Sequence, residues 1–152
     1  MNTETLEKMR KMKFYGMARA MKMSLEAGKD ELFTADELVS HLIDAEWDDR
    51  HNRSIDRHIS NARFRYKAAV EQIVYDGERT LDQNQVMRLA ECDFIARKEN
   101  VLITGSTGIG KSFLASALGH QACLMGFRTM YCNATKLFSH LKMAKGDGSY
   151  NK

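Results

Sequence analysis

A glycine-rich stretch in the second half of the chain carries the residues best suited to chemistry: Gly105-Ser106-Thr107-Gly108-Ile109-Gly110-Lys111-Ser112. The stretch fits the pattern G-x-x-x-x-G-K-[ST], the phosphate-binding P-loop. Glycines let such a loop aim successive backbone N–H groups at phosphate oxygens, because no Cβ blocks the approach. The lysine reaches the β- and γ-phosphates, and the serine hydroxyl ligates the Mg²⁺ that bridges them. The motif therefore predicts a site for the phosphates of a nucleotide together with Mg²⁺.

The sequence on either side supplies the elements that must position this loop. Residues 100–104 form a short apolar run with strand character, and residues 113–124 follow a helical pattern. This order places Lys111 at a helix N-terminus, where unpaired N–H groups and the helix dipole favour an anion. An ordinary glycine-rich turn before a helix is the alternative. We expect Lys111 to be catalytic, Ser112 to hold Mg²⁺, and the nucleotide to contact Gly105, Ser106, Thr107, Gly108, Ile109, Gly110, Lys111, Ser112 and Phe113.

Apolar periodicity and capping signals predict that most of the remaining chain is helical. Residues 34–37 (Thr-Ala-Asp-Glu) fit a capping box, with Phe33 and Leu38 placed as a hydrophobic staple. Asp82 is placed to cap a later helix, and Asp76-Gly77 marks a turn. We expect helices over residues 4–27, 34–61, 82–97 and 135–144, and a second strand over residues 128–132 that completes a βαβ unit spanning residues 100–132.

Basic residues are concentrated in one segment, although the net charge of the whole chain is only +3. Residues 31–49 hold seven acids and no Lys or Arg, whereas residues 50–70 hold six basic residues against one acid. Such a cluster suits DNA phosphates. A salt-bridged face, with Glu46–Arg50 and Asp49–Arg53 spaced i, i+4, and a subunit interface remain alternatives. The DNA-binding candidates are Arg57, Arg63, Arg65 and Lys67, which lack such partners, and then Arg50 and Arg53.

Other residue types give weaker signals. Phe64 and Tyr66 suit base stacking, but an aromatic residue beside a helix is more often packed in a core. The histidines and the cysteines Cys92, Cys123 and Cys132 show no metal-ligand spacing. Scattered cysteines favour a reducing cytoplasm, and no apolar run approaches the ~20 residues of a membrane span.

Three blocks of the sequence resemble the N-terminal part of the IstB-like proteins, the AAA+ helper ATPases of insertion-sequence transposons: residues 6–21, residues 38–46 leading into the arginine-rich helix, and residues 100–115. The resemblance implies an α/β fold. A helical N-terminal domain over residues 1–80 would bind DNA or a partner, and residues 81–152 would form the first part of the parallel sheet of an AAA+ P-loop domain. It also implies ATP and Mg²⁺ as cofactors, assembly into homo-oligomers, binding of duplex DNA with low sequence specificity, and a transposase as partner.

The chain departs from this family in the residues after the P-loop helix. The family has an acidic Walker B strand, a polar sensor and an arginine finger, whereas the only acid from residue 113 onward is Asp147. Hydrolysis needs a carboxylate to hold Mg²⁺ and polarise the attacking water. We therefore expect an AAA+ domain interrupted before Walker B, which binds ATP and DNA without hydrolysing ATP. A DnaC-type helicase loader, and a DNA-binding or oligomerisation module with a vestigial P-loop, are the alternatives.

Overall fold

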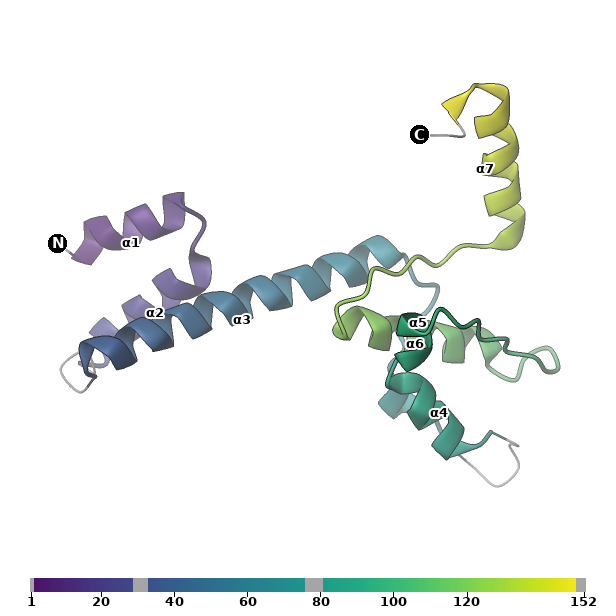
Figure 1. Cartoon of the computed structure of the whole chain (residues 1–152), viewed down its shortest axis with the longest axis horizontal. Coiled ribbons are helices and arrows are strands. Elements are labelled where there is room, and N and C mark those ends of the chain that lie inside the picture. Colours follow the sequence, from purple (N-terminus) through teal and green to yellow (C-terminus); the bar gives the residue numbers. More distant parts are fainter. Residues whose placement is uncertain (1, 29–32, 76–80, 150–152) are drawn as a thin grey trace. The chain divides into compact units, whose positions relative to one another are not determined.

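The structure, a computed structural model, describes residues 2–28, 33–75 and 81–149. Two compact units are present, Met1–Asp56 (the N-terminal unit) and Arg57–Lys152 (the C-terminal unit), and their boundary falls within one helix. The predicted domain boundary at residues 80 and 81 borders residues 76–80, which, like the predicted turn at Asp76-Gly77, lie outside the described residues. The elements are α1 (Asn2–Lys11), α2 (Tyr15–Glu26), α3 (Ala35–Ala62), the 3₁₀ helix η1 (Val70–Gln72), α4 (Gln83–Ala90), α5 (Asp93–Ala96), α6 (Lys111–Leu124) and α7 (Ala134–Gly146) (Figure 1).

The predicted α/β fold is wrong for the part of the chain that is described, because no residue there forms a strand. A strand exists only through hydrogen bonds to a neighbouring strand. Neither of the two segments expected to pair in a parallel sheet, residues 100–104 and 128–132, forms a strand. Leu102 is 88% exposed and Met130 is 73% exposed. The backbone N–H of Tyr131 instead donates to the carbonyl of Ala62 at the end of α3. The P-loop helix is therefore present without the two strands of the expected βαβ unit.

Helix ends that carry local capping signals agree with expectation. Thr34 and Glu37 exchange the hydrogen bonds of a capping box at the start of α3, with the Thr34 N–H 2.8 Å from Glu37 Oε2. The Asp82 carboxylate accepts from the Asn84 N–H at the start of α4. Gly126, with a φ of +87°, ends α6. Capping hydrogen bonds between residues close in sequence can thus be predicted from the sequence.

Two predicted helices are broken by residues whose backbone φ is positive. The helix expected over residues 4–27 is divided into α1 and α2, because Lys13 has a φ of +64° and the N–H of Phe14 donates back to the carbonyl of Met9. The helix expected over residues 82–97 is divided into α4 and α5 at Cys92, with a φ of +60°. This left-handed conformation usually belongs to glycine, so a lysine and a cysteine give no sequence signal for it.

The carboxylate of Glu46 joins α2 to α3 within the N-terminal unit. It accepts the N–H groups of Gly16 (2.9 Å) and Met17 (3.2 Å) at the start of α2, and Arg50 Nε lies 2.6 Å from its other oxygen. A Cβ at Gly16 would overlap the carbonyl oxygen of Ala45, so glycine allows this close approach. Burial tends to raise the pKa of Glu46, but the hydrogen bonds from Arg50, Met17 and Gly16 outweigh it and hold the pKa below its ordinary value.

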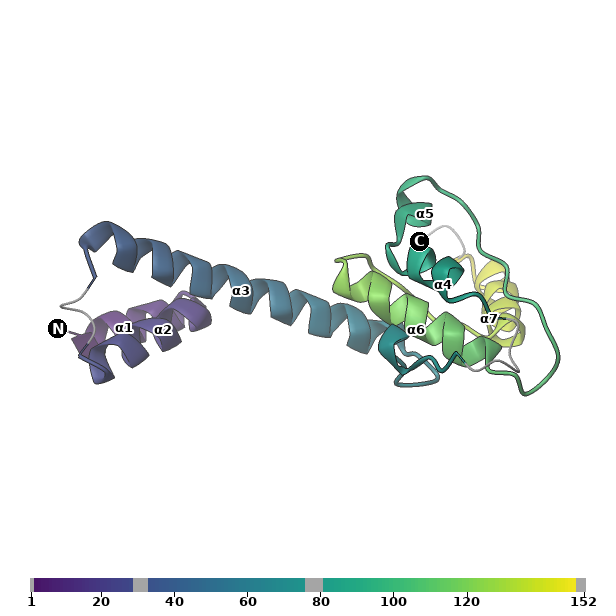
Figure 2. The ribbon, with the colours of Figure 1, turned by 90° about the horizontal axis from the view of Figure 1, so that it is seen from below.

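The C-terminal unit has its core where η1, α4 and α6 meet, and Figure 2 shows α4 beside α6. Small and β-branched side chains fill this core, so the three elements approach closely. Larger side chains, Phe113 and Leu114 of α6 among them, pack around it. The buried core residues are Ala68, Val70, Val86, Ala90 and Ala117.

Replacing Glu46 by Gln should lower the free energy of unfolding by about 1–2 kcal/mol at neutral pH, because hydrogen bonds to a charged acceptor are lost. The pKa of Glu46 is lowered in the fold, so its ionised form contributes stability above the unfolded value of 4.5 and loses that contribution as the pH falls through the folded value. The difference between wild type and Glu46→Gln should therefore shrink as the pH falls below 4.5 and through the lower pKa of the folded state. Urea unfolding followed by circular dichroism measures it.

The matched control for this prediction is Glu4→Gln. The Glu4 carboxylate forms an exposed ion pair with Lys8 at 2.7 Å, so its loss should change the free energy of unfolding by less than about 0.5 kcal/mol. A difference between wild type and Glu46→Gln that stays constant as the pH is lowered from neutral through the acid range would show that the Glu46 charge is not what stabilises this junction.

Candidate phosphate-binding site

Three glycines in the loop before α6 adopt positive φ angles, which other residue types rarely adopt. Gly105, Gly108 and Gly110 have φ values of +144°, +89° and +96°. A Cβ at Gly105 would also overlap the side chain of Ile109, which folds back over the loop. L-residues with a Cβ rarely adopt these angles, so the glycine spacing of the motif has a direct conformational cause.

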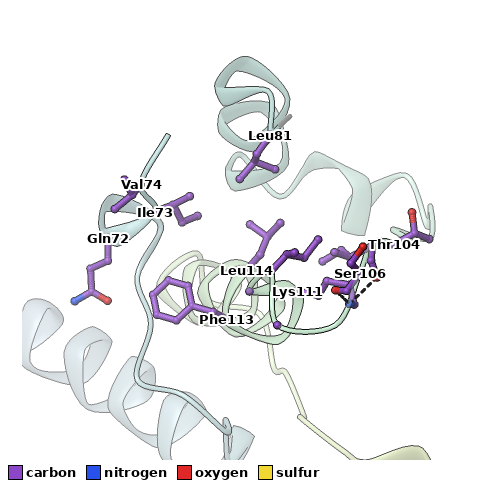
Figure 3. A pocket seen from close by; sticks show the side chains of 14 residues that line it. Gln72, Ile73, Val74, Leu81, Thr104, Ser106, Lys111, Phe113 and Leu114 are labelled. Atoms are coloured by element: carbon purple, nitrogen blue, oxygen red, sulfur yellow. Dashed lines mark hydrogen bonds between the residues drawn. The ribbon is translucent and has the colours of Figure 1, made fainter. Parts of the chain in front are cut away.

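Lys111 is the first residue of α6, and its side chain turns back across the loop. Its ammonium donates to the carbonyl of Gly105 at 2.8 Å and to the carbonyl of Ser106 at 2.6 Å (Figure 3). An ammonium group has three N–H donors, so one remains for an anion beside the loop. The first N–H groups of α6 are free of intrahelical partners at the same place. Positive charge and unpaired donors thus converge on one point.

The loop borders a cavity of about 690 Å³, a volume typical of small-molecule sites. Figure 3 shows Lys111 and Ser106 at one side and the side chains of Ile73, Leu81 and Leu114 at another. One side of the cavity is therefore cationic and the other aliphatic. The full lining is Gln72, Ile73, Val74, Leu81, Ile103, Thr104, Gly105, Ser106, Gly108, Ile109, Gly110, Lys111, Phe113 and Leu114.

Most of the residues predicted to contact a nucleotide lie in this cavity wall. Of the nine predicted, Thr107 and Ser112 are the two that do not line it. The structure also adds residues that the sequence reasoning missed, chiefly Ile73, Val74 and Leu81. They stand more than twenty residues before the loop and match no motif, so only the packing of η1 and α4 against α6 reveals them.

Ser112, the predicted Mg²⁺ ligand, lies in the first turn of α6, next to Lys111 but outside the cavity lining. No hydrogen-bond partner of its hydroxyl is found among residues 2–28, 33–75 and 81–149, so the oxygen is available. A hard oxygen donor of this kind fits Mg²⁺, which binds proteins through few groups and takes phosphate oxygens as further ligands. Among the same residues, no carboxylate lines the cavity.

Comparison with known proteins identifies the family. A family model described as IstB-like ATP binding protein matches residues 7–152. The chain belongs to this IstB-like family. The residues that form the glycine loop, the cavity wall and the basic segment all lie inside the matched range.

Several curated relatives of the IstB-like chain are described as putative ATP-binding proteins of insertion sequences. It is 36% identical over 146 residues to a putative insertion sequence ATP-binding protein of Sinorhizobium fredii, covering 96% of this chain and 60% of the relative. It is 34% identical over 153 residues to a putative ATP-binding protein of an insertion sequence from Pseudomonas fluorescens, covering 100% of this chain and 66% of that relative. The chain thus spans less than two thirds of the length of these two relatives.

Two of the predicted DNA-binding residues, Arg50 and Arg53, fall in the N-terminal unit, and both are held by acids. Arg50 pairs with Glu46, and Arg53 Nε lies 2.7 Å from Asp49 Oδ2. Their guanidinium groups also lie over the rings of Phe14 and Tyr15, at 5.3 and 5.1 Å from the ring centroids. Both ion pairs required by the salt-bridged alternative are therefore present, and a DNA role for these two arginines stays a prediction.

The other basic candidates of the IstB-like chain lie in the C-terminal unit. Within the described ranges, none of them forms an ion pair, as expected from the absence of acids at helical spacing. Phe64, between two of them, lies against Gly119 of α6, which favours the predicted packing role over base stacking. These residues are Arg57, Arg63, Arg65 and Lys67. No described helix has the length and apolar character needed to cross a membrane.

Replacing Gly110 by Ala should destabilise the loop, because alanine would have to adopt a φ near +96°. We expect the free energy of unfolding to fall by about 1–2 kcal/mol, measured by thermal or urea unfolding. Gly146→Ala is the matched control, since Gly146 has no positive φ and an added Cβ would meet nothing within 4 Å. Equal unfolding curves for the two variants would contradict the conformational role assigned to Gly110.

Proposed function

We propose that this chain binds ATP with Mg²⁺ at the P-loop and acts as a transposition helper, binding DNA and assisting a transposase. The observation that carries the nucleotide part is the position of Lys111. It begins α6, its ammonium is bonded to the loop carbonyls of Gly105 and Ser106, and it lines a cavity large enough for a nucleotide. The insertion-sequence relatives support the biological context, since their descriptions name ATP binding.

The cationic side of the cavity suits the triphosphate. Gly108 and Gly110 remove the Cβ atoms that would keep phosphates away from the backbone N–H groups of the loop. Lys111 supplies a mobile positive charge for the β- and γ-phosphates, and Ser112 would hold Mg²⁺ through its hydroxyl. The metal would neutralise phosphate charge there. Because the described lining of the cavity has no carboxylate, we propose binding and assign no hydrolytic step to this chain.

The aliphatic side of the cavity suits the base. Ile73 and Leu81 reach it from the end of η1 and the segment before α4, and Leu114 reaches it from α6 (Figure 3). A purine ring is planar and largely apolar on its faces, so aliphatic side chains can remove it from water on both sides. The backbone N–H and C=O groups of Val74, which lines the cavity, have no hydrogen-bond partner within the described residues and can bond its edge.

The other parts of the proposal are DNA binding, partner binding and assembly into oligomers. Basic residues without ion-pair partners in the described part of the chain, Arg57, Arg63, Arg65 and Lys67, support DNA binding through phosphates with low sequence specificity. We propose residues 1–80 as the DNA- and partner-binding region and residues 81–152 as the nucleotide-binding region, with Ile73 and Val74 of the first region completing the cavity wall, and homo-oligomers as the working form. The three cysteines are free thiols, which suits a cytoplasmic protein.

Replacing Lys111 by Ala should abolish ATP binding, because the only side-chain cation in the described cavity wall is lost. Isothermal titration calorimetry with ATP and Mg²⁺ measures the effect. Lys142→Ala removes an exposed lysine of α7 and should leave the affinity unchanged. Equal ATP affinity in wild type and Lys111→Ala would refute nucleotide binding at this loop.

Replacing Ile73 by Ala tests the base end of the cavity separately. Part of an apolar wall is removed, so ATP affinity should fall about five- to tenfold, corresponding to about 1–1.5 kcal/mol. Affinity for inorganic triphosphate, which has no base, should stay the same. A parallel fall for both ligands would place the base elsewhere or indicate a general loss of structure, which circular dichroism distinguishes.

A further inference from the structure

A second cavity lies wholly within the C-terminal unit and is not part of the nucleotide site. Its volume is about 480 Å³. It is formed by the last turn of α3, the segment after that helix and the middle of α6. We call it the α3–α6 cleft, and its lining is Ile59, Ser60, Arg63, Phe64, Tyr66, Lys67, Ala68, Ala69, Gln72 and His120.

The ionisable side chains that line the cleft are all basic. Arg63 and Lys67 enter it from the segment after α3, and His120 enters it from α6, whereas no acidic residue in the described part of the chain lines it. Within the described residues, none of these three side chains has a hydrogen-bond or ion-pair partner. Arginine, lysine and histidine are all donors, and His120 can donate an N–H in its neutral or its charged form. The cleft therefore presents unpaired donors to an anion.

The aromatic residues of the cleft are already engaged by the protein. Phe64 lies against Gly119, where an added Cβ would come within 2.6 Å of the ring. Tyr66 packs against Phe113, with ring centroids 6.4 Å apart, and the guanidinium of Arg65 covers its ring at 5.4 Å. A base would have to displace one of these contacts in order to stack. The cleft thus suits a phosphate group better than a base, and a phosphate contact is independent of DNA sequence.

We propose that the α3–α6 cleft holds a backbone phosphate of DNA, with Arg63, Lys67 and His120 as its contacts. This inference rests on the DNA-binding part of the proposed function and adds to it a defined site and a residue, His120, outside the basic segment. Because the contacts are to phosphate, the cleft contributes affinity without sequence preference. A cavity of this size admits one strand's backbone and not a whole duplex, so the same contact is open to duplex and single-stranded DNA.

The test uses variants that remove the charge or the donor of each contact. Arg63→Gln with Lys67→Gln should weaken binding of a labelled duplex about tenfold at moderate salt, and reduce the slope of log affinity against log salt by about one. His120→Ala should weaken binding about threefold. The losses should be the same for duplexes of unrelated sequence and should also appear with single-stranded DNA. Fluorescence anisotropy of the full chain measures all of these quantities.

Two controls separate the possible outcomes. Lys136→Gln with Lys142→Gln removes two positive charges from α7 and should leave the affinity and slope unchanged. Arg63→Lys with Lys67→Arg keeps both charges and should restore most of the affinity lost in the glutamine variant. ATP affinity, measured by calorimetry, should be the same in every variant, which shows that the C-terminal unit is folded.

Each alternative result has a distinct meaning. If the wild type binds DNA and the cleft variants match the α7 control, the cleft is not a phosphate site although DNA binding stands. If the wild type binds no DNA, the DNA-binding part of the proposed function fails together with the cleft. If the losses depend on base sequence, the cleft reads bases and the phosphate proposal is overturned.

Discussion

The C-terminal unit depends on one constraint, the positive φ values of the glycines in the loop that leads directly into α6. Gly108 and Gly110 adopt these angles, and Lys111 then begins the helix with its ammonium bonded to the loop carbonyls. The same turn determines which side of α6 faces η1 and α4, and so places Phe113 and Leu114 in the cavity wall. Loop geometry, helix orientation and cavity therefore share a single cause in the glycine spacing.

The features that could be predicted from the sequence are those whose causes are local. The P-loop, the capping box at Thr34 and the cap at Asp82 each involve residues within a few positions of one another, and all are found. The strands failed because a strand needs a partner distant in sequence, and residues 100–104 have none among the described residues. The helix breaks at Lys13 and Cys92 were missed because neither residue type favours a positive φ.

In the N-terminal unit, basic residues of α3 that the sequence suggests for DNA binding form ion pairs within the protein. Glu46 satisfies the first N–H groups of α2, and the arginines that neutralise the acids of α3 lie over aromatic rings. In the sequence, Arg50, Arg53 and Arg63 belong to one basic segment. In the structure, Arg50 and Arg53 each form an ion pair with the acid four residues earlier on α3. Arg63 has no ion-pair partner in the described ranges. Charge composition alone therefore overstates the number of available cations.

Helix α6 carries Lys111 in its first turn and His120 nine residues later, about 13 Å along its axis. Gln72 belongs to the walls of both cavities, and the Tyr66–Phe113 ring pair joins residues of the two walls. The two cavities therefore share walls along a single helix, so a substitution that shifts α6 would change the lining of both.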